Sequence, residues 1–247
     1  MKKPKVGLPK FGYVTRLATA SGLFMAFFGV ADSVVLHNYF TSDYDKYIGS
    51  LVYIIVGGWL GVVVMFLVGA VFGKSLEPRF LSWKIPKGKV LLYVILAGIT
   101  GALQTVFYLY GLSKFTPGLV AILMVGSLLG QNALDVISKE LAFKILMVPT
   151  LLIVTGSIIA SISKSSGLSM EAIVVVFLLV NFFDTTATFM RQKTSELKDS
   201  AGNRLIDSIN FELWRFLWLA FFGTVISFSW VVYQHQLYLM KSVFSGG

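Results

Sequence analysis

Two aspartates, Asp32 and Asp184, lie within long apolar stretches of this 247-residue chain. A carboxylate is costly to bury in such surroundings and normally faces a partner or a water-filled cavity. It can bind a proton or pair with a cation, and this is the chemistry that the two residues offer. The alternative is a structural role as acceptors of interhelical hydrogen bonds. For both aspartates we favour the functional interpretation.

Polar side chains recur at helical spacing in four of the apolar stretches. The members of these stripes are Gly29, Asp32 and Ser33; Thr100, Gln104 and Tyr108; Ser127, Gln131 and Asp135, with Asn132 adjacent; and Asn181, Asp184, Thr185 and Thr188. Residues three or four positions apart lie on one face of a helix. Four polar faces predict a shared wet interior, and the residues assigned to this cavity or to ion coupling are Asp32, Asp184, Gln104, Tyr108, Gln131, Asp135 and Asn181. Hydrogen bonds that only hold helices together explain Gln104, Gln131 and Asn132 equally well.

The elements that carry these stripes are seven apolar runs, each long enough to cross a bilayer. They cover residues 17–40, 48–73, 89–112, 116–138, 142–162, 170–190 and 208–233. A membrane-spanning helix needs about 20 mainly apolar residues. The chain is 56% hydrophobic and 13% charged, with a mean hydropathy of +0.78, so it lacks the charged surface of a soluble domain. We therefore predict an all-α polytopic membrane protein with about seven transmembrane helices in a lipid bilayer.

Basic residues predict how this bundle is oriented. Sixteen of the 21 Lys and Arg residues lie in the N-terminal tail (residues 1–16) and in the segments that follow the second, fourth and sixth runs. By the positive-inside rule these segments are cytoplasmic, which places the N-terminus inside, at a plasma (inner) membrane. The net charge of +9 is thus explained by topology, and no nucleic-acid partner is expected.

A pair of charged residues, the tyrosines and the histidines can be interpreted from their positions in the sequence. Glu212 and Arg215 are spaced i, i+3 and are predicted to form a charge pair, for which structural and functional roles are equally good interpretations. Most of the ten tyrosines are expected to face lipid or to lie in interfacial belts, with Tyr108 as the exception. The two histidines, His37 and His235, are far apart and there is no cysteine, so no metal site is predicted.

The two aspartates also indicate an internal repeat. A shift of 152 residues aligns residues 28–33 with residues 180–185, so that Asp32 matches Asp184 and Ser33 matches Thr185. Five runs separate the starts of the two copies, and an odd number inverts the second copy in the membrane. Asp32 is then expected on the outer side of the midplane and Asp184 on its cytoplasmic side.

The region from residue 111 to 161 resembles the EamA-type repeat of the drug/metabolite transporter superfamily. The resemblance rests on GLSKFTPGLVAIL from position 111, on SKELAF with its acidic Glu140, and on LIVTGS with Gly156. It implies two inverted five-helix repeats around a central cavity. Residues 17–163 would form the first repeat and residues 164–247 an incomplete second repeat of two helices, with three further helices expected beyond it.

The function predicted from these features is secondary transport of a small polar metabolite or drug by alternating access, with protons as a candidate coupling ion. The sequence contains no ATP-binding motif, and neither an enzyme activity nor a cofactor is predicted. An ion channel and a seven-helix receptor-like protein are the alternatives. A homodimer is also compatible with these features.

Overall fold

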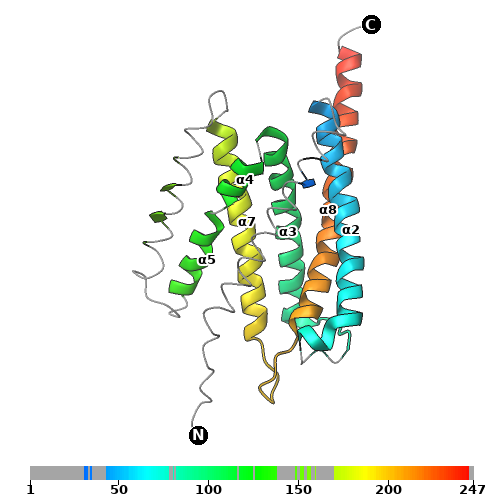
Figure 1. Cartoon of the computed structure of the whole chain (residues 1–247). Helices are drawn as coiled ribbons and strands as arrows, with labels where there is room; N and C mark the ends of the chain where they lie inside the picture. The colour runs from blue at the N-terminus through cyan, green and yellow to red at the C-terminus, as the bar shows by residue number, and fades with distance from the viewer. Residues whose placement is uncertain are drawn as a thin grey trace.

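The computed structural model describes residues 43–77, 80, 82–115, 117–124, 126–137 and 170–244, together with the single positions 31, 32, 34, 148, 151, 152, 155, 156 and 159. The regular structure of these residues is helical, apart from an isolated bridge between Lys198 and Arg204. The helices are α2 (Asp43–Leu76), α3 (Gly88–Lys114), α4 (Pro117–Met124), α5 (Gly126–Ile137), α7 (Met170–Glu196) and α8 (Ser208–Phe244) (Figure 1). The basic tail and most of the first and fifth predicted spans lie outside the described residues, as does Glu140.

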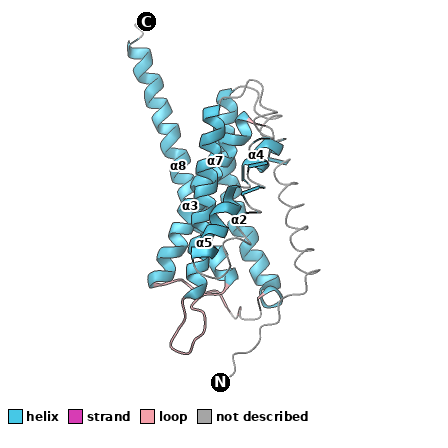
Figure 2. Ribbon diagram, turned by 90° about the vertical axis from the view of Figure 1, so that its left-hand side faces the viewer, coloured by secondary structure: helices cyan, strands magenta, loops and turns pink. Residues whose placement is uncertain are grey.

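Helix α3 occupies the centre of the bundle. It packs against α7 on one side and α8 on the other, while α2 packs on α8 and both α4 and α5 pack on α7 (Figures 1 and 2). A third of the most apolar segment of α3 is buried, compared with 17% for α2 and 22% for α8. Side chains on α3 are therefore the ones that meet several helices at once.

Helix α2 runs antiparallel to α8, and α3 runs antiparallel to α7. Along α2 and α8, Leu51 contacts Ser227 and Trp59 contacts Thr224, so residue numbers rise on one helix as they fall on the other. Gln104 on α3 likewise contacts Asp184 on α7, whereas Gly111 faces Val176. The segments that connect α2 to α3 and α7 to α8 consequently lie at the same end of the bundle (Figure 1).

Three of the described helices are long and apolar enough to cross a membrane: residues 51–76 of α2, 88–112 of α3 and 208–235 of α8. They correspond to the second, third and seventh predicted spans. Each also exposes large apolar side chains, such as Val56 on α2, Leu92 on α3 and Phe228 on α8, which a water-facing surface would disfavour. These helices are consistent with an integral membrane protein.

The fourth and sixth predicted spans have different outcomes. The described parts of the fourth are two short helices, α4 and α5, on either side of residue 125. The sixth corresponds to the 27-residue α7, which is not among the three candidate spans found in the described residues. Three of the seven predicted membrane spans are therefore supported by the described residues.

Small residues allow close helix contacts. A Cβ added at Gly58 of α2 would lie 3.0 Å from the Ala220 backbone of α8. The sequence analysis did not predict this pairing, but the absence of a side chain at Gly58 explains how α2 and α8 approach so closely.

A polar cap joins the two connecting segments. Asp207 accepts hydrogen bonds from the backbone N–H of Asn210 (2.9 Å) and from its amide (2.7 Å), as an N-cap of α8 does. The same amide donates to the Ser82 carbonyl (3.0 Å), and the Lys84 N–H donates to Asn210 Oδ1 (2.8 Å). Asn210 is fully buried, so its hydrogen bonds fix the 82–84 segment against the start of α8.

Candidate functional site

Asp32 is held by two tyrosines from different helices. The hydroxyl of Tyr53 on α2 donates to Asp32 Oδ1, and the hydroxyl of Tyr108 on α3 donates to Oδ2 at 3.2 Å. Asp32 is only 8% exposed. Both carboxylate oxygens therefore have a donor, which lowers the free-energy cost of keeping this group inside the bundle.

Asp184 on α7 is held by a third donor from the same face of α3. Gln104 Nε2 donates to Asp184 Oδ1 at 3.0 Å. Gln104 and Tyr108 are one helical turn apart, about 6 Å along the axis. The predicted stripe on α3 thus contacts both aspartates, and Asp32 lies further than Asp184 from the end that carries the basic connecting segments.

Asn181, another predicted cavity residue, has a packing role. It is 7% exposed, and its amide donates to the Leu123 carbonyl of α4 (2.8 Å) and to the Phe177 carbonyl one turn earlier in α7 (2.5 Å). Its Oδ1 is buried without a hydrogen-bond partner among the described residues. The hydrogen bond from Asn181 to Leu123 thus links α7 to α4.

The predicted residues of α5 lie on the far side of α7. Gln131 lines an open pocket of about 380 Å³ between α5, α7 and the connecting segment that ends at α8. Asp135 belongs to α5, but its side chain lies outside the described residues. The structure therefore brings Asp32, Tyr108, Gln104 and Asp184 together along α3, whereas Gln131 faces a separate space.

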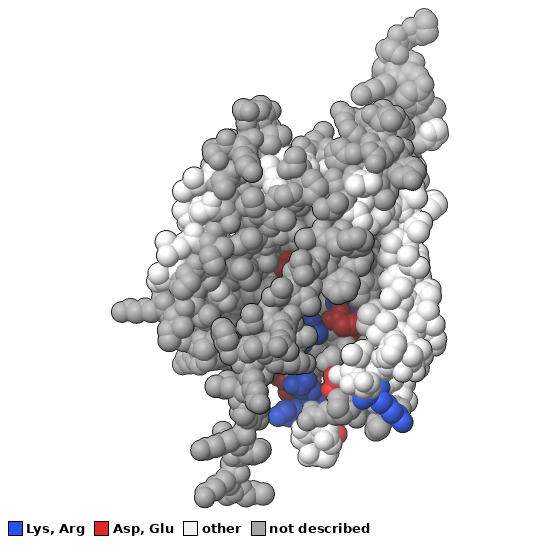
Figure 3. Space-filling view, in the orientation of Figure 1, with Lys and Arg blue, Asp and Glu red and all other residues white. Residues whose placement is uncertain are grey.

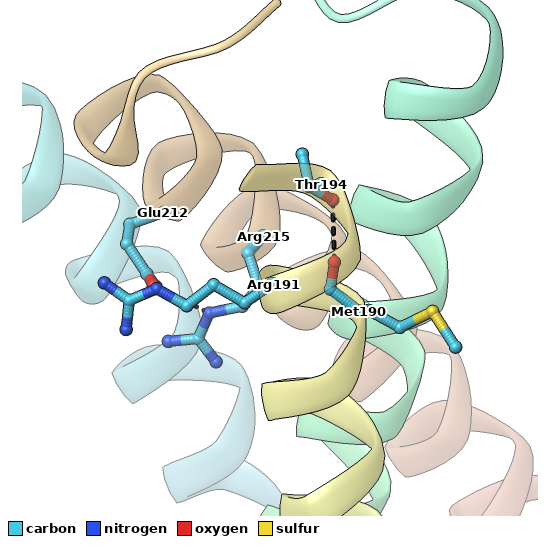
Figure 4. Close-up of polar contacts among 5 residues, drawn as sticks. All are labelled: Met190, Arg191, Thr194, Glu212 and Arg215. Atoms are coloured by element: carbon cyan, nitrogen blue, oxygen red, sulfur yellow. Dashed lines mark hydrogen bonds and ion pairs between the residues drawn. The ribbon is translucent and has the colours of Figure 1, made fainter. Parts of the chain in front are cut away.

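The predicted charge pair is confirmed and is part of a larger group. Arg215 Nε lies 2.6 Å from Glu212 Oε2, and Arg191 Nε on α7 lies 3.4 Å from Glu212 Oε1 (Figure 4). One turn further along α7, the Thr194 hydroxyl donates to the Met190 carbonyl at 2.7 Å, also shown in Figure 4. Glu212 thereby links α7 to α8 near their connecting segment.

Charged side chains gather at this end of the bundle. Figure 3 shows the described Lys, Arg, Asp and Glu residues mainly where the two connecting segments lie, and an uncharged surface along the described residues of α2 above them. The distribution matches a helix bundle whose middle contacts lipid and whose charged end contacts water.

Three partners were missed by the sequence analysis. Tyr53 lies near the start of its apolar run and was covered only by the general expectation that tyrosines face lipid or the interface, yet it contacts Asp32. Arg191 was counted only as a basic loop residue, yet it pairs with Glu212. Asp207 precedes an apolar run, and this N-cap signal is one that sequence reasoning can use.

The fold and the site indicate the class of protein to which this chain belongs, but they identify no family. The described residues form a helical bundle with three candidate membrane-spanning helices and a line of polar contacts along the central one. Comparisons with family models, with curated proteins and with solved structures find no match to this chain. The resemblance to the EamA-type repeat therefore rests on the sequence pattern.

Proposed function

We propose that this protein is a secondary transporter that moves a small polar metabolite or drug by alternating access, and that it is not an enzyme. One observation carries the proposal: Tyr108 and Gln104, on one face of the central helix, hydrogen-bond to the carboxylates Asp32 and Asp184. Carboxylates inside a membrane bundle are rare and mark pathways for ions or substrates.

Asp32 is the proposed binding centre. Two phenols donate hydrogen bonds to its oxygens, and a substrate cation or a proton would compete with these donors for the carboxylate. Aromatic rings beside a carboxylate suit an organic cation, because the ring faces also attract positive charge. The proposed substrate therefore carries an amine or a similar group.

Helix α3 is the proposed coupling element. A helix is stiff over one turn, so a shift of α3 relative to its neighbours changes the Tyr108–Asp32 and Gln104–Asp184 contacts together. Alternating access requires such a two-state element, whose equilibrium a bound ligand can bias. Proton binding at either aspartate is the proposed means of coupling to an ion gradient.

The proposed architecture is a seven-span bundle with an EamA-type repeat and an inverted partial copy. In support, α2 and α8, the second helices of the two proposed copies, pack together and run antiparallel. The connecting segments 77–87 and 197–207 share one end and carry basic residues. We assign that end and the N-terminus to the cytoplasmic side of a plasma (inner) membrane.

The test uses the full chain reconstituted in lipid vesicles that contain a pH-sensitive dye. Amines, amino acids, nucleosides and drugs are added in turn, and proton movement and substrate uptake are recorded. Asp32→Asn is expected to abolish uptake of the substrate that the wild-type protein takes up, with equal amounts of folded protein in the vesicles. The control Glu77→Gln removes one carboxylate outside the helix contacts and should transport normally. Normal uptake by Asp32→Asn, or ion conductance without any substrate, would contradict the proposal.

A further inference from the structure

The pocket of about 380 Å³ beside Gln131 is separate from the contacts around Asp32 and Asp184. It lies at the charged end of the bundle, between α5, the last two turns of α7 and the connecting segment before α8. Its volume falls within the range of small-molecule sites, which are about 300–1,000 Å³.

Two arginines supply the charge of this pocket. Arg191 and Arg204 both line it, and no carboxylate side chain does so among the described residues. The Arg191 side chain is 58% exposed, and its Nε is the atom that faces Glu212. Arg204 is exposed, and in the described part of the chain no acidic side chain pairs with it. The guanidinium of Arg204 is thus available to an anion.

Two acidic residues at this end of the bundle, Glu212 and Asp207, already have partners. Glu212 is shared between Arg191 and Arg215, and the carboxylate of Asp207 accepts two hydrogen bonds from Asn210. Neither carboxylate lines the pocket of about 380 Å³. Asp207 lines a smaller adjoining pocket of about 40 Å³, which shares Arg191 and Arg204 with it.

Neutral donors complete the lining. They come from three elements: Gln131 on α5, Thr188 and Gln192 on α7, and Ser208 on α8. Ser208 is also the first residue of α8, whose N-terminus is already capped by the Asp207 carboxylate. Hydroxyl and amide donors beside arginines match an anion with several oxygens better than a single-point acceptor.

We propose that this pocket binds a phosphate ester. A phosphate group presents several acceptor oxygens to the arginines, the hydroxyls and the amides, and the remaining volume accommodates the alcohol that carries it. The ester can be the headgroup of an anionic lipid or a soluble compound, because the pocket is open and lies at the charged end of the bundle. This inference goes beyond the proposed transport function and does not depend on it.

Binding to the full chain in a maltoside detergent tests the proposal, in two arms. Glycerol 3-phosphate is titrated by calorimetry, and phosphatidylglycerol is added and its bound copies are counted by native mass spectrometry. Arg204→Gln removes a charge from an exposed segment and should weaken binding about tenfold, as expected for one charge-assisted hydrogen bond. The matched control is Lys198→Gln, because Lys198 lies opposite Arg204 in the isolated bridge but does not line the pocket.

The outcomes distinguish a soluble ester from a lipid headgroup, and specific binding from attraction by net charge alone. If glycerol 3-phosphate binds and Arg204→Gln weakens that binding, the ligand is a soluble ester. If only phosphatidylglycerol binds and Arg204→Gln weakens its binding, the ligand is a lipid headgroup. Thr188→Val, which keeps the side-chain shape, should weaken whichever ligand binds. Equal losses in Arg204→Gln and Lys198→Gln would show attraction by net charge only and would overturn the proposal, as would the absence of binding of either probe.

Discussion

Gln104 Nε2 on α3 lies 3.0 Å from Asp184 Oδ1 on α7, although the two residues are 80 positions apart in the chain. The contact joins the middle of two packed helices, and it lies one turn from the Tyr108–Asp32 hydrogen bond. The central helix therefore carries two adjacent donors for two carboxylates from different segments.

The Gln104–Asp184 pair should show a measurable coupling energy. In a double-mutant cycle with Gln104→Ala and Asp184→Ala, we expect about 0.6 kcal/mol, and at most about 1.7 kcal/mol, as found for hydrogen bonds between membrane helices. Thermal or denaturant unfolding in detergent measures it. Additive effects of the two substitutions would show that the contact contributes nothing to stability.

The tyrosines around Asp32 should matter for flux more than for folding. Tyr53→Phe and Tyr108→Phe each remove one hydroxyl donor from Asp32 and keep the ring. Leaving one carboxylate oxygen without its donor should cost about 1–3 kcal/mol of stability, and we expect transport to fall by more than the amount of folded protein does. Uptake into vesicles, normalised to folded protein, checks this. Tyr233→Phe is the matched control, because Tyr233 is exposed on α8. Losses of flux that only follow losses of folded protein would assign the two hydroxyls to packing.

The approach of α2 to α8 should depend on one glycine. A Cβ at Gly58 would lie 3.0 Å from the backbone of Ala220, whereas a Cβ at Gly57 would meet only the Tyr53 ring at 3.9 Å. We expect Gly58→Ala to destabilise the protein by about 1–3 kcal/mol through overpacking. Gly57→Ala should leave stability within about 0.5 kcal/mol of the wild type. Unfolding of both variants in the same detergent makes the comparison, and equal midpoints would contradict the packing described here.

Topology can be measured with single cysteines, because the chain contains none of its own. In intact cells, an impermeant thiol reagent should fail to label Ser82→Cys and Ser200→Cys, which lie in the two connecting segments at the basic end. The same reagent should label His235→Cys, near the opposite end of α8. Labelling of Ser82→Cys from outside would reverse the proposed orientation.

The sequence by itself determined the features that depend on neighbours along the chain. Hydropathy over about 20 residues predicted α2, α3 and α8, because the thickness of the hydrocarbon core sets that length. The i, i+3 spacing predicted the Glu212–Arg215 pair, since a helix places these residues on one face. The stripe of Gln104 and Tyr108 was predicted for the same reason.

The tertiary structure alone decided which stripes meet. Tyr53 and Tyr108 reach the same carboxylate, Asp32, because α2 lies beside α3. Arg191 reaches Glu212 because the end of α7 lies near the start of α8. A helix shows its polar face in its own sequence, but its neighbours are selected by close packing, as at Gly58 and Ala220. Those contacts depend on residues far apart in the chain, and no local pattern encodes them.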